Sequence, residues 1–412
     1  MDKQRRRLVG GASGLLGLGA VAVATRGAGN SEVAAQAVAG VPDPRAPMVS
    51  VAAFGARGDG SADDGNALRR ALAWVGEIYA GTGGAAPRLY VPAGTYAYDR
   101  SPNFAVTALA LECAPGVVFH HQGEGPAFVL DGGATGGGAY RIHIVGMPTI
   151  RGNARSGIGV DVRALHHSVV TANVRDVATA VLRTRWAVSS EFRIRSTGLG
   201  INGSKPVPVD GLVLEPRNRN EATSDCLFHM PIIEQVSNVG IRLVEAGNCT
   251  FLSGTSEANG VGGVHVGPAS AGNTFIGLDL EFNGKYGILC EGLRNGFIGI
   301  YEDKLSTFAG AGNWVRGHLF NEIDNRGDGN AFETLGYAAA GGRFLDTGTN
   351  TRKILARNLT SGRIDPDYYG GAGTAIAKPS GGAVRDTEAR EAIAALTARL
   401  EALGLVGRLP PR

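Results

Sequence analysis

The sequence is poor in cysteine and in aromatic residues. Its 412 residues contain only 4 cysteines, and aromatic residues make up 7% of the chain. The cysteines, Cys113, Cys226, Cys249 and Cys290, are too few and too scattered for a disulfide framework or a zinc site. The composition therefore excludes the small domains that depend on disulfides or on structural zinc.

The sequence also lacks an excess of charge of either sign. Its formal net charge is +3, but five of the 40 basic residues and two of the 37 acidic residues lie within residues 1–39. The remainder carries no net charge. Nothing in this balance indicates a nucleic acid or an anionic membrane as a partner, because both require an excess of basic residues.

Long hydrophobic runs are scarce, and the clearest one is Leu15–Ala24. It follows Arg5-Arg6-Arg7-Leu8-Val9, which resembles the twin-arginine export motif, and Ala37-Val38-Ala39 is a plausible cleavage site. We predict a signal peptide over residues 1–39, a linker over 40–48, and export to the periplasm or the medium. An uncleaved membrane anchor is the alternative, although the run is short for a spanning helix.

Glycine, in contrast, is abundant, with 64 residues and no collagen period, which is typical of a fold with a turn every few residues. A short pattern recurs four times between Cys226 and Glu302, at offsets of 23, 24 and 22 residues. Its copies begin at Cys226-Leu227-Phe228, Cys249-Thr250-Phe251, Asn273-Thr274-Phe275 and Asn295-Gly296-Phe297. The first three continue to Glu234, Glu257 and Glu281 and end at Gly240-Ile241, Gly263-Val264 and Gly287-Ile288.

This repeat predicts an all-β solenoid, the parallel β-helix. A unit of this length with apolar residues at every second position is one coil of three strands and three turns, and not a domain. Equivalent residues of successive coils should then be neighbours. Cys226 and Cys249 would lie side by side, either as buried thiols, which we favour, or as a disulfide.

Looser copies of the pattern extend the solenoid in both directions. They occur at Gly159-Val160, Ala180-Val181, Gly200-Ile201 and Gly211-Leu212. The longer step from Gly211 to Gly240 predicts an inserted polar loop around Glu215–Ser224, a place where specificity is often found. After Asp303 the period is lost, and the strand-like runs of residues 304–380 form either irregular final coils or a contact between subunits.

Residues 49–98 carry two further motifs. The segment Phe54-Gly55-Ala56-Arg57-Gly58-Asp59-Gly60 leads to Asp63-Asp64 and a helical pattern, and Val91-Pro92-Ala93-Gly94-Thr95-Tyr96 follows. Together they resemble the opening of the rhamnogalacturonase/epimerase-like pectate lyase superfamily. The resemblance implies a right-handed parallel β-helix over residues 49–380, with a helix covering its first coil, and it implies carbohydrate chemistry. Asp63 or Asp64 is expected to cap that helix.

The C-terminal segment 381–412 is predicted to contain a helix over residues 386–403. Its apolar residues follow a/d spacing for about two and a half heptads. Such a helix either packs on its own solenoid or joins copies of the chain, for example in a homotrimer.

The resemblance also implies that a polysaccharide lies along one outward face, beside the turn before the glycine. The outward residues after that glycine are expected to be Asp161, Leu182, Asn202, Val213, Arg242, His265 and Leu289. The residues just before it are Asp210, Val239, Gly262, Lys285 and Tyr286. Polygalacturonase-type hydrolases place paired aspartates there, but here only Asp210 is acidic. Their arrangement is therefore not expected.

Two chemistries stay open. β-Elimination on a uronate needs a cation, a base and an acid, and Arg242, His265, Lys285 and Tyr286 are suitable. Hydrolysis needs a pair of carboxyl groups, which the stacked Glu257 and Glu281 could supply together with Asp279 or Asp210. The structural alternative for the four residues suited to elimination is that they are solvated side chains at the edge of a groove. For the glutamates it is that each one caps its turn.

Asp161, Asn202, Asn259 and Asn283 are predicted to bind the substrate. No cofactor is expected, and calcium at the acidic stack would lack the usual compact Asp-rich loop. We therefore predict an exported enzyme that cleaves a polysaccharide, with a slight preference for elimination. The alternatives are a glycan-binding, tail-spike-like trimer of little or no activity, and a polymer-level sugar epimerase.

Overall fold

The computed structural model describes residues 48–358, apart from 83, 85–87, 134–136, 198–206, 318, 334, 338–342 and 354–355, and also residues 396 and 398. The predicted signal peptide, almost all of the linker and nearly all of the C-terminal helix lie outside the described residues. So do Gly200-Ile201 and Asn202.

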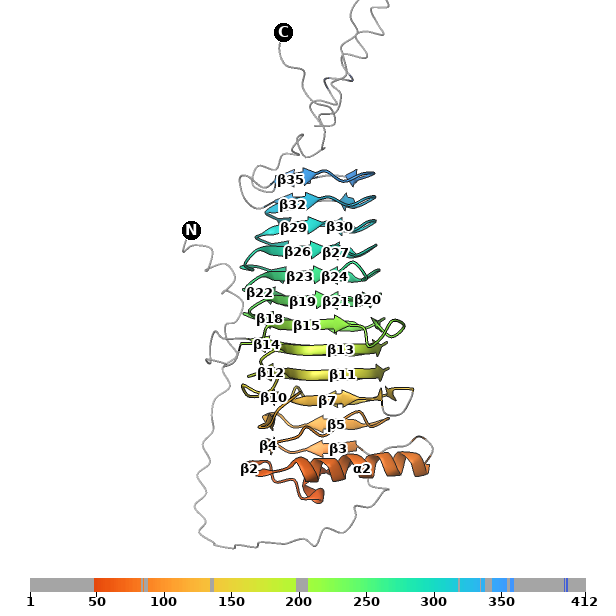
Figure 1. Ribbon diagram of the computed structural model, residues 1–412, viewed down its shortest axis with the longest axis vertical. Coiled ribbons are helices and arrows are strands. Elements are labelled where there is room, and N and C mark those ends of the chain that lie inside the picture. Colours follow the sequence, from red (N-terminus) through yellow and green to blue (C-terminus); the bar gives the residue numbers. More distant parts are fainter. Residues whose placement is uncertain are drawn as a thin grey trace, which may run out of the picture. The chain divides into compact units, whose positions relative to one another are not determined.

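The chain folds as a right-handed parallel β-helix, in which three columns of strands run up the solenoid (Figure 1). Two columns belong to one 24-stranded sheet, here called sheet A, and the third is a 13-stranded sheet, sheet B. All pairings between the described strands are parallel, as in β1 with β3 and β11 with β13. Each coil passes through the first column of sheet A, then its second column, then sheet B. The predicted fold class is confirmed.

The first column of sheet A contains β1 (Met48–Ser50), β3 (Arg88–Val91), β5 (Ala110–Cys113), β9 (His143–Val145), β12 (Val169–Arg175), β14 (Glu191–Thr197), β17 (Leu227–His229), β21 (Thr250–Leu252), β24 (Thr274–Ile276), β27 (Gly296–Ile298), β30 (Trp314–Arg316), β33 (Ala331–Glu333) and β36 (Arg352–Lys353). The second column contains β2 (Asp59–Asp63), β4 (Gly94–Tyr98), β6 (Val117–His121), β10 (Thr149–Arg151), β18 (Ile232–Glu234), β22 (Thr255–Glu257), β25 (Asp279–Leu280), β28 (Tyr301–Glu302), β31 (Leu319–Phe320), β34 (Leu335–Tyr337) and β37 (Ala356–Asn358). Strands β12 and β14 are long enough to serve both columns.

Sheet B contains β7 (Phe128–Asp131), β8 (Ala139–Tyr140), β11 (Ile158–His166), β13 (Ala180–Val188), β15 (Asp210–Glu215), β16 (Thr223–Ser224), β19 (Val239–Leu243), β20 (Ala246–Gly247), β23 (Gly262–Val266), β26 (Tyr286–Cys290), β29 (Leu305–Phe308), β32 (Glu322–Asn325) and β35 (Arg343–Asp346). The predicted polar loop is present as residues 216–222, between β15 and β16.

A helix lies across the start of the stack, as predicted (Figure 1). After the short 3-10 helix η1 (Val51–Phe54), helix α2 (Gly65–Thr82) buries the face that carries Ala67, Leu68, Ala71, Leu72 and Val75. The Asp63 carboxylate accepts a hydrogen bond from the Gly65 N–H at 2.9 Å, so it caps the helix. Asp64 instead accepts from the N–H groups of Arg57 and Gly58 and holds the preceding turn. Both acids are structural.

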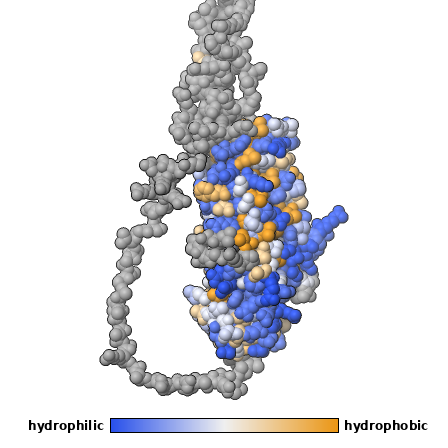
Figure 2. Space-filling model, turned by 60° about the vertical axis from the view of Figure 1, so that its left-hand side comes forward, coloured by the Kyte–Doolittle hydropathy of each residue, from blue (hydrophilic) through white to orange (hydrophobic). Residues whose placement is uncertain are grey.

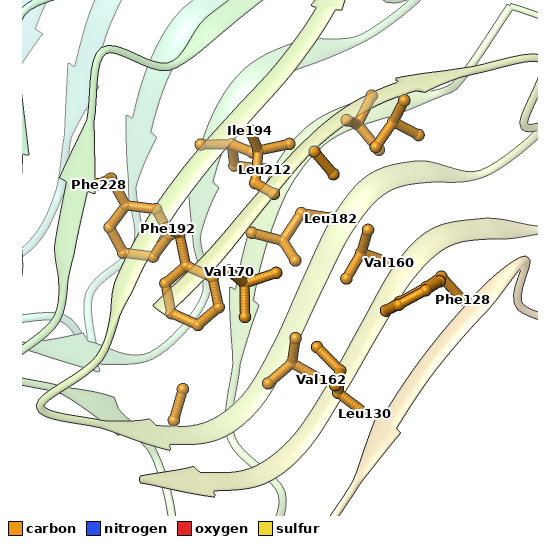
Figure 3. Close-up of a cluster of buried hydrophobic side chains, with 14 of the residues drawn as sticks. Phe128, Leu130, Val160, Val162, Val170, Leu182, Phe192, Ile194, Leu212 and Phe228 are labelled. Carbon is orange, nitrogen blue, oxygen red and sulfur yellow. The ribbon is translucent and has the colours of Figure 1, made fainter. Parts of the chain in front are cut away.

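The four-copy repeat forms one coil per copy. Phe228, Phe251, Phe275 and Phe297 are register partners in successive strands, and their rings stack at centroid distances of 4.5, 4.7 and 4.9 Å. These distances equal the spacing between neighbouring strands. Further down, apolar side chains from both sheets meet inside the solenoid in the same way (Figure 3). Cys226 and Cys249 are buried free thiols.

The repeated glycine is the second residue of its strand in sheet B, just after the chain has left sheet A. A Cβ atom on Gly240 would lie 2.0 Å from the Ser256 hydroxyl oxygen, and one on Gly263 would lie 2.8 Å from the Asn283 amide nitrogen. Both neighbours are buried inside the solenoid. Because a Cβ atom would overlap these buried side chains, only glycine fits at this position of the motif.

The coils continue after Asp303 and become shorter, which is why the period of 22 to 24 residues ends there. Trp314 pairs with Gly296, and Ala331 pairs with Trp314. A ladder of buried asparagines, Asn273, Asn295, Asn313 and Asn330, runs through these coils. Each side chain accepts from the backbone N–H of the one before it.

Candidate functional site

The candidate site lies at the turn where each coil enters sheet B. Two outward rows meet there. One contains Asp210, Val239, Gly262 and Tyr286, and the other contains Val213, Arg242, His265 and Leu289. Figure 2 views the side where the strands of sheet B begin, and hydrophobic residues form a broken strip among hydrophilic ones in its upper half.

Asp210 and Arg242 form the inner part of this site. The Arg242 Nη2 atom lies 2.7 Å from Asp210 Oδ2, and Asn238 Nδ2 donates to Asp210 Oδ1 at 2.7 Å. The side chain of Asp210 is only 7% exposed, whereas that of Arg242 is 34% exposed. The buried Arg242 Nε has no hydrogen-bond partner. A ligand cannot reach this Nε atom, but the guanidinium as a whole is partly exposed and Asp210 takes only one bond from it, so it keeps donor capacity for another acceptor.

The Tyr286 ring lies across the neighbouring coil. A Cβ atom on Gly262 would lie 2.0 Å from the ring, so only glycine leaves room for it. Burial and the charge of Asp210 raise the pKa of Tyr286 to about 12, against the opposing effect of Arg242. The phenol therefore stays protonated at neutral pH and cannot serve as the base, and it can give up its proton only to a strongly basic atom such as a leaving alkoxide oxygen.

A carboxylate of the next coil holds the side chain of His265. Its Nε2 atom lies 2.9 Å from the Glu291 carboxylate. Because an ionised carboxylate can only accept, Nε2 carries the proton, and Nδ1 of a neutral ring is the free acceptor. His265 and Arg242 are register partners in adjacent strands, so they lie side by side. Lys285 is exposed directly before Tyr286.

The predicted acidic stack occupies the other side of the same turn. Glu234 and Glu257 are register partners, and Asp279 pairs with Thr255 of the preceding coil. Burial, together with Glu281 and Asp303, raises the pKa of Asp279 to about 6. Burial and the charge of Glu234 also raise the pKa of Glu257. The Asp279 Oδ1 atom has no hydrogen-bond partner.

Several predicted site residues are buried and cannot contact a substrate directly. Asn259 and Asn283 are 1% and 0% exposed, and their side chains bond each other and the neighbouring backbone. The structure thus corrects their assignment to substrate binding and supports the structural alternative. Asp161 is also fully buried and lies beneath Arg163 and Arg185, which both bind it.

The prediction that Leu182 lies on the outward face is wrong, because it aligns this strand with the preceding one a single residue out of register. Strand β13 pairs Leu182 with Val160 and Arg183 with Asp161. Leu182 is fully buried, and Arg183 takes the outward position. The segment Ala180-Val181-Leu182 is apolar throughout, so its sequence fits the repeat in two registers that differ by one residue.

The sequence did not predict two residues that hold side chains of the candidate site in place. Glu291 lies directly after β26, beyond the repeat pattern, and only its contact with His265 reveals it. Asn238 precedes the strand and fixes Asp210. Among the described residues, no group of three or more His, Cys, Asp or Glu side chains is arranged to hold a metal ion. Within the same residues, no helix has both the length and the apolar character to cross a membrane.

Comparison with known proteins agrees with the motifs of residues 49–98. Residues 48–107 match the family described as rhamnogalacturonase A/epimerase, pectate lyase-like. The resemblance to the pectate lyase-like β-helix proteins is confirmed. The match covers only the N-terminal coils, and no curated protein matches the chain.

The solved structures that are similar to the chain include the following three. They are the Geobacillus virus E2 ORF18 protein (14% identity, 76% of this chain and 61% of that one, TM-score 0.46), the Streptococcus pneumoniae surface adhesin PfbA (13%, 76% and 93%, 0.46) and the A-module of the Azotobacter vinelandii mannuronan C-5 epimerase AlgE6 (14%, 74% and 99%, 0.41). The chain thus spans about three fifths of the Geobacillus virus protein. Such low identities and TM-scores say nothing of this chain's activity or assembly.

Proposed function

We propose that the protein is an exported enzyme that cleaves a uronate-containing polysaccharide by β-elimination. The observation that carries the proposal is the arrangement of a partly exposed arginine, a protonated tyrosine and a histidine bound by a carboxylate on neighbouring coils at one turn. The match of residues 48–107 to the pectate lyase-like family supports the same substrate class.

In the proposed reaction each side chain has one role. Arg242 binds the uronate carboxylate and stabilises the charge that develops when the C5 proton leaves. Nδ1 of His265 takes that proton, with Glu291 stabilising the imidazolium. Tyr286 gives its proton to the glycosidic oxygen at C4 as the C4–O bond breaks. The products are an unsaturated uronate end and a new hydroxyl end, and the exposed Lys285 is suited to bind a neighbouring carboxylate.

The test is the ultraviolet absorbance of unsaturated uronates during incubation with polygalacturonate, alginate and a neutral glucan. Wild type should produce an unsaturated product from a uronate polymer. Tyr286→Phe and His265→Gln should each lower kcat by about a hundredfold, while Tyr90→Phe, at an exposed position on sheet A, should not. Absence of absorbance with every uronate polymer would refute the proposal.

Hydrolysis by the acidic stack is the second candidate. The specific observation in its favour is the raised pKa of Asp279, which holds a proton up to about pH 6, as a general acid must. It predicts new reducing ends without ultraviolet absorbance, and loss of activity in Asp279→Asn and Glu281→Gln. Binding without any new chain ends would instead favour the glycan-binding spike.

A further inference from the structure

A row of aromatic side chains lies at the opposite end of sheet B, away from Asp210 and Arg242. Tyr140, His166 and Trp186 come from successive coils, and Arg217 comes from the loop after β15. The rings of Tyr140 and His166 stack at 4.8 Å, and Trp186 meets His166 edge-on at 4.8 Å. The Arg217 guanidinium carbon lies 5.4 Å from the centre of the Trp186 ring. We call these four residues the aromatic shelf.

The shelf rests on a buried histidine and opens outward at Tyr140. His166 is 6% exposed, and burial lowers its pKa, so the ring is a neutral support for its neighbours. Tyr140 is 40% exposed although one face is covered by His166. The ring of His167 also lies 6.1 Å from that of Tyr140, so two histidines hold the tyrosine at a fixed angle while its exposed part remains available to a ligand.

Backbone strain keeps Trp186 out of the core. Its φ is +66°, and the equivalent Ala164 of the coil below has φ +52°. Register partners flank these two residues on both sides, Arg163 with Arg185 and Leu165 with Ala187, so the same bulge is stacked in both coils. Positive φ is unfavourable for a bulky residue such as tryptophan. The bulge turns a tryptophan outward at a position where alternation would bury it.

The loop that carries Arg217 is fixed rather than loose. The Arg217 N–H donates to the Glu221 carbonyl at 2.8 Å, and its guanidinium lies 3.5 Å from the Glu221 carboxylate. The same guanidinium lies so close to Gly133 that a Cβ there would be 3.1 Å from Nη2. The shelf is therefore a preformed surface across four coils.

The charges beside the shelf are balanced. Arg163 and Arg185 both bind Asp161, and Arg183 binds Glu215. Nucleic acid would require unpaired positive charge, which this cluster lacks. Flat aromatic faces beside neutralised arginine donors suit a ligand with apolar C–H faces and many hydroxyl groups, which is the chemistry of a sugar ring.

We propose that the aromatic shelf is a second glycan subsite, which binds a distant part of the polysaccharide chain whose cleavage site lies at Arg242 and Tyr286. This inference rests on the proposed function for its ligand class. Strand β15 links the two regions, with Asp210 at its start and the Arg217 loop after its end, and its six residues span about 20 Å. Only a glycan of several sugars can reach both.

The test is retardation of the protein in native gels that contain polygalacturonate, alginate or a neutral glucan. Wild type should be retarded by at least one of them. Trp186→Ala and Tyr140→Ala should each raise the apparent Kd about tenfold, and Trp186→Tyr should keep most of the retardation. Trp314→Ala, at a half-buried tryptophan on sheet A, is the matched control and should behave as wild type.

The outcome is independent of cleavage. Tyr286→Phe should be retarded as strongly as wild type while forming unsaturated product about a hundredfold more slowly. If polymer is cleaved, Trp186→Ala should raise KM for the polymer and leave turnover of short oligosaccharides unchanged. Retardation of wild type by none of the polymers, or full retardation of Tyr140→Ala and Trp186→Ala, would overturn the proposal.

Discussion

At the scale of single residues, Asp279 shows how stacking changes a titration. Its carboxyl lies near Glu281 of the same coil and Asp303 of the next, and burial together with these two charges raises its pKa to about 6. A raised folded-state pKa means that the fold favours the neutral form. The stabilisation is therefore complete below the ordinary pKa of about 4 and is lost as the pH rises through about 6.

Asp279→Asn should consequently stabilise the protein at pH 8 and change it little at pH 4. Because the group is half-exposed, we expect a gain of only about 1 kcal/mol. Thermal melts at the two pH values measure the difference. Glu124→Gln, at a strongly exposed position, is the control and should show no such pH dependence. An equal effect of Asp279→Asn at both pH values would show that burial and the neighbouring carboxylates do not raise the pKa of Asp279.

At the scale of structural elements, the asparagine ladder replaces an apolar core at one corner of the solenoid. Asn295 is fully buried, accepts from Asn273, and donates to Asn313 at 3.2 Å. Asn295→Ala would leave its neighbours' buried polar groups unsatisfied and should cost about 2–3 kcal/mol. Chemical denaturation measures this cost. Asn220→Ala in the exposed loop should stay within about 0.5 kcal/mol of wild type.

The glycine of the repeat makes a matched prediction. Gly263→Ala places a Cβ 2.8 Å from both the Asn283 amide and the Gly287 carbonyl oxygen, and should destabilise by about 2 kcal/mol or more. Gly81→Ala lies in α2 with nothing within 4 Å, and should be neutral or stabilising by up to about 1 kcal/mol. Equal effects of the two substitutions in thermal melts would show that close approach does not explain the motif.

The sequence predicted the coils better than it predicted the site. Coils follow from a period that repeats along the chain, and the alternation around Gly240 and Gly263 placed Arg242 and His265 correctly on one outward face. Contacts between coils have no such period. The His265–Glu291 pair depends on one side chain reaching past a strand end, and the aromatic shelf depends on a backbone bulge at Trp186 that alternation does not foresee.

At the scale of the whole molecule, export is the remaining proposal. We propose that residues 1–39 direct the chain through the twin-arginine route, on the grounds of Arg5-Arg6-Arg7 and the apolar run that follows. In a bacterial host, N-terminal sequencing of the exported protein should give a start at residue 40. Replacing Arg5, Arg6 and Arg7 by lysine should retain the full-length protein in the cytoplasm, whereas Arg26→Lys should not.

The uniform stacking of the coils has one more consequence. Each coil pairs with the coil before it and the coil after it, at a spacing of about 4.8 Å. The distance along the solenoid between side chains on different coils is therefore a whole number of these spacings. Insertion or loss of one coil would change the distance between Tyr140 and Arg242 by one step and leave the surroundings of each intact. On our proposal that both regions bind one glycan, the number of coils between them sets how long that glycan must be.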